Sequence, residues 1–250
     1  MKPAFVLHSP DTLTDYSIFI EEPSATEPGP WPAIAFLDGD DQFTAAVSAY
    51  HSARKAGELP APLLLVGVGY GASYSKPANK RGRDYTQSTH SDEPTSGGAE
   101  AFTRFLTNTL WPELARRYPL RDDQRGIAGH SLGSLLVLYT LWRDPPFFTH
   151  YLASAPSIWW DDRHILTFAA QRHVQNATLP ARLYLSVGEE DSASMTGDLT
   201  LLEQQLKARP FSQLDLTTRR FPRRNHFNVL PDAFHSGLVT LFGSRPRVHA

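Results

Sequence analysis

Short apolar segments alternate with segments of helical periodicity along most of the chain. The clearest apolar segment, 62–68, is nearly continuous, as expected for a strand that is buried on both faces of a parallel sheet. Repeated alternation of strand and helix is typical of a mostly parallel sheet with helices on both faces, which is an α/β fold. The expected strands are 33–37, 62–68, 125–129, 149–154, 182–187 and 214–221, and the expected helices are about 41–56, 98–118, 132–142, 163–174, 195–208 and 231–242.

Two further runs, about 4–9 and 16–21, precede this alternation and flank the turn-like sequence Pro10-Asp11-Thr12-Leu13. Runs separated in this way are typical of paired strands. A chain of 250 residues, of which 41% are hydrophobic, can bury a large core. Because no internal repeat or linker interrupts it, we expect residues 1–250 to form one α/β domain.

The segment 69–96 is long and polar and has no clear periodicity. Loops of more than a dozen residues are uncommon in compact domains and are often functional. We therefore expect this segment to form a wall of a substrate site. A disordered insertion is the alternative interpretation.

Composition excludes several classes of partner and chemistry. The formal net charge is −2, and no block of like charges suggests a nucleic-acid or anionic-membrane partner. The absence of cysteine excludes a disulfide framework, a thiolate metal site and a cysteine nucleophile. The first eight residues reach polar side chains before an apolar core could form, so we expect no secretory signal and a cytoplasmic location. Oligomeric state is not indicated by the sequence.

One motif in the sequence has the pattern of a catalytic site. Gly129-His130-Ser131-Leu132-Gly133 matches G-x-S-x-G and lies between an expected strand and a strongly apolar expected helix. This is the setting of the nucleophile elbow of α/β-hydrolases, in which a tight turn lifts the serine hydroxyl out of the sheet. The sequence therefore predicts an α/β-hydrolase fold with Ser131 as nucleophile.

A serine nucleophile needs a histidine to take its proton and a carboxylate to orient that histidine. In this fold the chain order is serine, acid, histidine. His226 lies between the last expected strand and the last expected helix, on the edge of the sheet that carries the elbow, whereas His164 precedes the acids and His235 falls inside a helix. We predict His226 as the general base.

The acid is expected after the strand 182–187, where Gly188-Glu189-Glu190-Asp191 follows. All three carboxylates could belong to a solvated loop. Asp191 is favoured because a short side chain beyond a small turn can reach back to an imidazole, and Glu190 is the alternative acid.

An oxyanion hole requires main-chain N–H groups close to the nucleophile. Leu132 follows the nucleophile at a helix N-terminus and supplies the first expected donor. The second is expected in the loop after the strand 33–37, where Gly39 and Asp40 are the candidates. The alternative interpretation of Asp38-Gly39-Asp40 is an ordinary turn and helix cap.

The chain resembles the putative esterase family, which contains esterase D, the siderophore trilactone esterases and the mycolyltransferases. The resemblance spans nearly the whole chain and is most specific at the segments 37–43, 129–133, 154–160 and 225–227. The segments 154–160 and 225–227 are most similar to the siderophore-esterase branch. The resemblance implies a nucleophile at Ser131, a base at His226, and an acid that matches Asp191 by its distance from Gly188.

Two features depart from the family pattern. Ser134 stands where relatives often have a second glycine after the elbow. Some siderophore esterases resemble Ser–His dyads, so the resemblance leaves open whether an acid is needed at all.

The resemblance also suggests residues that bind the substrate. Arg83 lies in a segment similar to the family's Arg-x-x-Asp and could bind an anionic or catecholate-like group, while an ion pair with Asp84 is the alternative. Trp159 and Trp160 follow an expected strand at the edge that carries the elbow, where one of them could line the pocket; core packing is the alternative.

These observations predict a serine carboxylic-ester hydrolase that acts through an acyl-enzyme on a small-molecule ester. No cofactor is required, and no metal-binding motif is present in the sequence. Two alternatives use the same fold: acyl transfer to an alcohol, as the mycolyltransferases do, and a non-catalytic ligand-binding protein. The physiological ester is not indicated.

Overall fold

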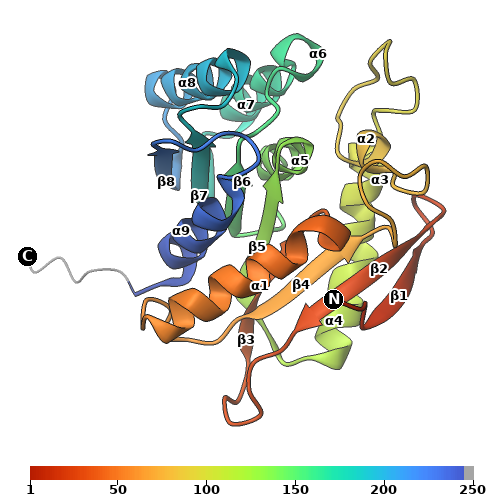
Figure 1. The fold of residues 1–250 in the computed structure, drawn as a ribbon. Coiled ribbons are helices and arrows are strands. Elements are labelled where there is room, and N and C mark those ends of the chain that lie inside the picture. The colour runs from red at the N-terminus through yellow and green to blue at the C-terminus, as the bar shows by residue number, and fades with distance from the viewer. Residues whose placement is uncertain (245–250) are drawn as a thin grey trace, which may run out of the picture.

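An eight-stranded sheet crosses the molecule in the computed structural model, which describes residues 1–244 (Figure 1). The strands are β1 (Phe5–Ser9), β2 (Thr14–Glu21), β3 (Trp31–Phe36), β4 (Leu64–Gly69), β5 (Leu120–His130), β6 (His150–Ser154), β7 (Thr178–Gly188) and β8 (Ser212–Phe221). Their order is β1-β2-β4-β3-β5-β6-β7-β8. The two N-terminal strands pair antiparallel, β2 is antiparallel to β4, and the strands from β4 to β8 are parallel.

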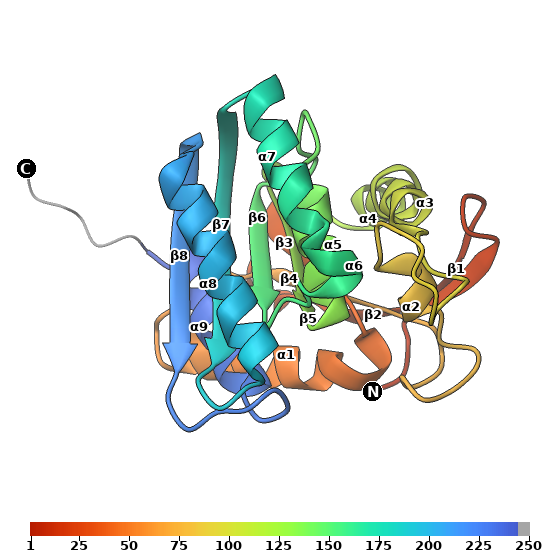
Figure 2. The same ribbon diagram turned by 90° about the horizontal axis from the view of Figure 1, so that it is seen from above.

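Helices cover both faces of this sheet (Figures 1 and 2). They are α1 (Gly39–Lys55), α2 (Arg81–Asp84), α3 (Ala99–Arg104), the π-helical η1 (Phe105–Leu110), α4 (Trp111–Arg117), α5 (Leu132–Leu141), α6 (Trp160–Arg163), α7 (Ile165–Gln175), α8 (Ala193–Ala208) and α9 (Leu230–Phe242). Helices α1 and α9 pack together on one face, and α5 and α8 pack on the other. The predicted mostly parallel sheet between two helical layers is confirmed.

Alternate residues of the strands supply the two cores. On β5, Ile127 faces the α5 layer and Ala128 faces α1 and α9, as the two-residue period of a strand requires. Helix α5 is apolar on every side, because the sheet covers one side and α7 and neighbouring helices cover the others. The strongly apolar segment after Ser131 is therefore a central, buried helix.

The expected helix 98–118 is the main local difference from prediction. It is divided into α3, η1 and α4, so its periodicity is interrupted by a π-helical segment. Pro112 lies just after this segment and has no N–H to donate to the carbonyl of Asn108, which disfavours a regular α-helix there.

In the described part of the chain, none of the helices has the length and hydropathy that crossing a membrane requires.

Candidate active site

Ser131 stands on a strained turn between β5 and α5. Its backbone angles are φ 59° and ψ −123°, which are unfavourable for a residue with a side chain. A Cβ atom at Gly129 would lie 2.4 Å from the carbonyl carbon of Gly133, so the strand and the helix can approach this closely only with glycine at 129. The turn has the geometry of a nucleophile elbow.

Hydrogen bonds to β6 fix the elbow in place. The Ser131 N–H donates to the carbonyl of Ser154 at 3.0 Å. The Ser134 hydroxyl lies 2.6 Å from the Gly129 carbonyl and 2.7 Å from the Ser154 carbonyl, so it can donate to either. Ser134, where relatives often have glycine, therefore ties the start of α5 to both β5 and β6.

Asp191 is the acid that reaches His226. The His226 Nδ1 and Asp191 Oδ2 atoms are 2.8 Å apart, and the Asp191 side chain is only 3% exposed. A Cβ atom at Gly188 would lie 2.2 Å from the Arg224 carbonyl oxygen, so glycine at this position lets the two loops come together. Glu190 is exposed, and among residues 1–244 it makes no hydrogen bond to His226.

The contact with Asp191 determines which ring nitrogen of His226 can accept a proton from the serine. An Nδ1–H that donates to the carboxylate leaves Nε2 as the proton acceptor. In the resting structure Ser131 Oγ lies 3.3 Å from Ser157 Oγ, and within the described residues it makes no hydrogen bond to His226. Ser131 and His226 nevertheless line the same two cavities. Catalytic hydrogen bonds are often long in unliganded sites and shorten when substrate binds.

His130 packs against His226. The two ring centroids are 4.6 Å apart, and His130 Nδ1 lies 3.1 Å from the Ser154 hydroxyl. Burial, together with repulsion from a charged His226 and from Arg81, lowers the pKa of His130 to about 3. His130 is therefore neutral near pH 7 and gives the neighbouring imidazole an uncharged surface. The sequence analysis assigned no role to this residue.

A buried ion pair holds a cation beside the nucleophile. Arg81 donates from Nε to Asp38 Oδ1 at 2.9 Å and from Nη2 to Oδ2 at 3.1 Å, a bidentate contact. Burial raises the pKa of the Asp38 carboxyl, and the Arg81 charge opposes that shift. Arg81 lines a cavity with Ser131, and among residues 1–244 its Nη1 makes no hydrogen bond to the protein.

Arg81, and not Arg83, lines this cavity. Arg83 donates to the buried carboxylate of Asp84 at 2.6 Å and to the Thr14 hydroxyl at 2.9 Å, so its guanidinium fastens α2 to the start of β2. Arg83 therefore forms the ion pair with Asp84 that was the alternative to a role in substrate binding. Sequence spacing alone does not show which of Arg81 and Arg83 lies at the active site.

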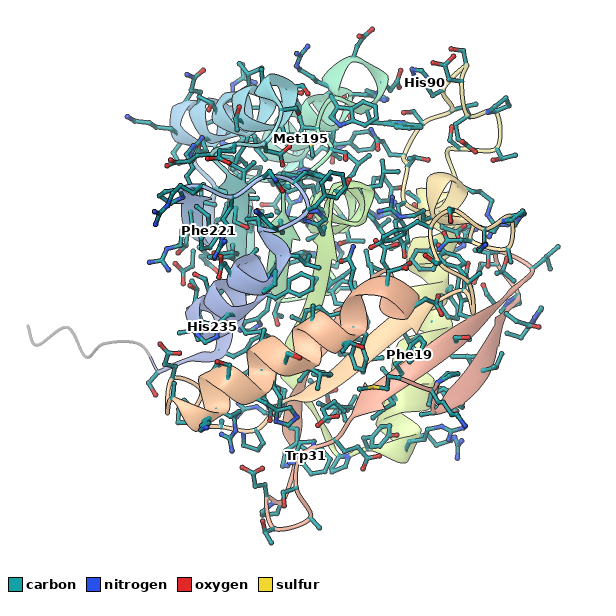
Figure 3. The ribbon with its side chains drawn as sticks, viewed as in Figure 1. Phe19, Trp31, His90, Met195, Phe221 and His235 are labelled. Carbon is teal, nitrogen blue, oxygen red and sulfur yellow. The ribbon has the colours of Figure 1, made fainter. Side chains whose placement is uncertain are left out.

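The two tryptophans have different environments. Trp159 is 43% exposed and lines the cavity on the α8 side of Ser131. Trp160 is buried, and its indole N–H donates to the Ser88 carbonyl at 3.3 Å. It also contacts the ring of His90, which Figure 3 shows near the tip of the long loop and beside α6. Trp160 thus anchors the loop, while Trp159 faces the site.

The expected oxyanion donors lie at the starts of two helices. The N–H groups of Asp41 and Gln42 donate to the Asp38 carbonyl, whereas Gly39 and Asp40 begin α1 and have no intrahelical acceptor. The Asp40 carboxylate accepts from the Tyr70 N–H at 2.5 Å. Side chains of Asp41 and Gln42 line a cavity with Ser131, whereas Gly39, Asp40 and Leu132 are not among the lining residues.

Two cavities of about 470 and 480 Å³ flank the nucleophile. Ser131, His226 and Phe227 line both of them. The first is otherwise lined by Trp159, Glu190, Asp191, Ser192, Met195 and Asn225. The second is otherwise lined by Asp41, Gln42, Tyr74, Arg81, His130 and Leu230. Of the segment 69–96, Tyr74 and Arg81 line the second cavity.

Comparison with known proteins gives related esterases. A family model described as "Putative esterase" matches residues 9–229. The ferri-bacillibactin esterase BesA of Bacillus subtilis is 32% identical over 240 residues, which cover 86% of this chain and 81% of BesA. The siderophore triacetylfusarinine C esterase of Aspergillus fumigatus is 35% identical over 149 residues, which cover 58% of this chain and 50% of that protein.

A solved structure has the same arrangement. The crystal structure of the BES protein from Bacillus cereus superposes with a TM-score of 0.86 at 25% identity, covering 96% of this chain and 94% of that one. The fold of the two proteins therefore agrees over nearly the whole of both chains.

Proposed function

Because the chain belongs to the putative esterase family and is a serine carboxylic-ester hydrolase with an α/β-hydrolase fold, we propose that Ser131, His226 and Asp191 are its catalytic triad. The observation that carries the proposal is the 2.8 Å contact between His226 Nδ1 and Asp191 Oδ2 beside the strained serine. The experiment that tests it is substitution of each member with kinetics on one ester.

The proposed reaction has two steps. His226 Nε2 takes the proton of Ser131 Oγ as that oxygen attacks the ester carbonyl, and Asp191 stabilises the imidazolium that forms. The imidazolium then protonates the departing alcohol oxygen, and the acyl group stays on Ser131. In the second step His226 deprotonates a water molecule that attacks the acyl-enzyme, which releases the acid and restores the serine.

The tetrahedral intermediate needs donors for its oxyanion. We assign this role to the main-chain N–H groups of Leu132 and of Gly39 or Asp40, all at helix starts where N–H groups lack intrahelical acceptors. Arg81 is an additional candidate, because Asp38 holds one edge of its guanidinium and its Nη1 has no protein partner among the described residues.

The substrate class that we propose is a siderophore ester. The support is the similarity to BesA, which covers most of both chains, together with the aromatic side chains and the Arg81 guanidinium that line the cavities beside Ser131. A hydrolysis screen with short aryl esters, S-formylglutathione, feruloyl esters and trilactone siderophores tests it. The highest kcat/KM is expected for a trilactone siderophore, and a preference for S-formylglutathione would contradict the proposal.

The choice between the acids gives a direct prediction. Asp191→Asn is expected to lower kcat by about 10²–10⁴-fold, because an amide cannot stabilise the imidazolium and favours the wrong tautomer of His226. Glu190→Gln is the matched control, since Glu190 is the exposed residue just before Asp191 and, within residues 1–244, makes no hydrogen bond to the imidazole. Steady-state kinetics on one aryl ester measure both, and a larger loss in Glu190→Gln would make Glu190 the acid.

The Asp38–Arg81 pair gives a second prediction. Asp38→Asn keeps a residue that tolerates its left-handed backbone (φ 55°) but removes the charge that anchors Arg81. We expect kcat/KM to fall by about 10–100-fold, the range of a charge-assisted hydrogen bond. Asp92→Asn is the control, because that side chain is 90% exposed. Unchanged kcat/KM in a folded Asp38→Asn protein would remove the ion pair from the mechanism.

Two predictions remain from the sequence. A cytoplasmic location is one, and fractionation of cells that express the full protein would test it. The other is that residues 1–250 form one domain, which would appear as a single cooperative unfolding transition; residues 245–250 lie outside the described part of the structure.

A further inference from the structure

The segment that follows β6 contacts the nucleophile at three of its atoms. The Ser131 N–H donates to the Ser154 carbonyl at 3.0 Å, and the Ser131 carbonyl accepts from the Ser157 N–H at 3.2 Å. The two side chains meet as well, with Ser131 Oγ 3.3 Å from Ser157 Oγ. A single short segment of backbone, 154–157, therefore holds the nucleophile at its N–H, its carbonyl and its hydroxyl.

The turn that carries Ser157 is fixed by its backbone. Ala155 has a φ of 45°, in the left-handed region, which is unfavourable for a residue with a side chain. Its N–H donates to the Ser186 carbonyl on β7 at 2.7 Å, and the ring of Pro156 restricts φ at the next position. The Trp160 N–H then donates to the Ser157 carbonyl at 3.2 Å. Backbone hydrogen bonds before and after Ser157 thus set the position of its side chain.

The Ser157 hydroxyl is enclosed by protein. The residue is only 1% exposed, and it is not among the residues that line either cavity. Within residues 1–244, the one hydrogen-bond partner of its hydroxyl is Ser131 Oγ. Side-chain hydroxyls in proteins bond mostly to backbone groups or to water. Here a buried hydroxyl is directed instead at the oxygen that attacks the substrate.

The burial of Ser157 determines the direction of this hydrogen bond. Its proton has no other acceptor in the described part of the chain, and a buried donor without a partner is unfavourable. Ser131, by contrast, lines both cavities and can direct its own proton toward Nε2 of His226 when substrate binds. Ser157 is therefore the donor and Ser131 Oγ the acceptor, which leaves the Ser131 proton free for the base.

We propose that Ser157 is a catalytic residue that donates a hydrogen bond to the reacting oxygen of Ser131. The inference rests on the proposed function and deepens it. In acylation, Ser131 Oγ gains negative charge as His226 takes its proton; in deacylation, it gains negative charge again as its bond to the acyl carbon breaks. A donor that is already in place stabilises this charge without reorganisation. The Ser157 proton stays on its own oxygen throughout, so the proton transfers through His226 are unchanged.

Ser157 acts on a different atom from the oxyanion donors. The N–H groups of Leu132 and of Gly39 or Asp40 are assigned to the former carbonyl oxygen of the substrate, whereas Ser157 bonds to the oxygen of the enzyme. Its contribution is therefore expected for every ester, whatever its acid and alcohol. Because Ser157 lines neither cavity, the affinity for substrate should not depend on it.

Pre-steady-state kinetics on p-nitrophenyl acetate test the proposal, because they separate substrate dissociation, acylation and deacylation. Ser157→Ala is expected to lower the rate constants of acylation and deacylation by about 10–100-fold each, the range of a hydrogen bond to a charged group. The substrate dissociation constant should stay within about twofold of the parent value. Unchanged rate constants would overturn the proposal. So would faster acylation, which would mean that Ser157 holds the nucleophile away from its base.

Two further variants separate catalysis from packing. Ser157→Cys has a similar volume but a weakly donating thiol, so its rate constants are expected to lie between those of the parent and of Ser157→Ala. Rate constants equal to the parent's in Ser157→Cys would contradict the proposal, even if Ser157→Ala fails to fold. Ser9→Ala is the control, because Ser9 is a buried serine on β1 that accepts from the Thr12 N–H at 3.1 Å and lines neither cavity. Its rate constants should match the parent's.

The rate of fluorophosphonate labelling distinguishes a failure of this proposal from a failure of the proposed function. The reagent reacts with the nucleophilic serine and needs no ester, and Ser157→Ala is expected to slow the labelling of Ser131 by about 10–100-fold. If Ser157→Ala is labelled as fast as the parent, the role of Ser157 is excluded and the assignment of Ser131 stands. If the parent is not labelled and hydrolyses no ester, the proposed function itself fails.

Discussion

Ser131→Ala is expected to lower kcat for ester hydrolysis by about 10⁴–10⁶-fold, because the acyl-enzyme cannot form without the hydroxyl and triad members act as a unit. The fold should be retained. Alanine has the same backbone constraint at φ 59° as serine, and the lost hydroxyl makes a single 3.3 Å contact with Ser157. Steady-state kinetics on an aryl ester, with circular dichroism of both proteins, measure the two expectations.

Ser48→Ala is the matched control for this substitution, since Ser48 is an exposed serine whose hydroxyl bonds only to its own helix at Thr44. A fluorophosphonate should label the parent protein and Ser48→Ala but not Ser131→Ala. Turnover within tenfold of the parent in a folded Ser131→Ala protein would exclude Ser131 as the nucleophile.

The fold could be predicted because its determinants are local. The near-continuous run at 62–68 and the apolar segment after Ser131 have patterns typical of a strand buried on both faces and of a central helix, and the structure has both. The family and the class of reaction, predicted from the segments around Ser131 and His226, are confirmed by the comparisons. The π-helical segment before Pro112 could not be predicted, because apolar spacing in 98–118 is compatible with a regular helix.

Which residues pair with one another in the active site depends on contacts between segments that are distant in the sequence. Which of three adjacent acids reaches His226 depends on how closely the loop after β7 approaches the loop after β8, which Gly188 permits. The sequence favoured Asp191 for its short side chain, but spacing alone left Glu190 open.

Arg81 and Asp38 are 43 positions apart, and no periodicity connects them. Charge pairing across loops is set by tertiary structure, so the sequence pointed to Arg83, whose partner is its neighbour Asp84. The role of Asp38 was likewise missed, because an Asp-Gly sequence before a helix is typical of a turn and cap. Its side chain makes no cap hydrogen bond and instead binds the guanidinium.

His226→Ala is expected to lower kcat about as much as Ser131→Ala, and the double variant should lose little more than either single one, because neither residue works without the other. Stability should fall as well. Without the imidazole, the nearly buried Asp191 carboxylate keeps a 2.7 Å hydrogen bond from the Ser192 N–H but loses its hydrogen-bond partner His226. Thermal denaturation therefore has to accompany the kinetics, which are measured well below the melting temperature.

His235→Ala is the matched control for this prediction, because His235 lies on α9 and pairs with the exposed Glu58, away from both cavities. Its kcat should stay within about twofold of the parent, as for surface substitutions generally. If His226→Ala keeps more than a tenth of the parent activity, another group takes the serine proton. His130 is then the nearest imidazole, but the low pKa that its burial causes makes it a weak base. Since a neutral His130 would be available as a base at any pH well above 3, a kcat that stays low from pH 5 to pH 9 in His226→Ala would leave His226 as the base.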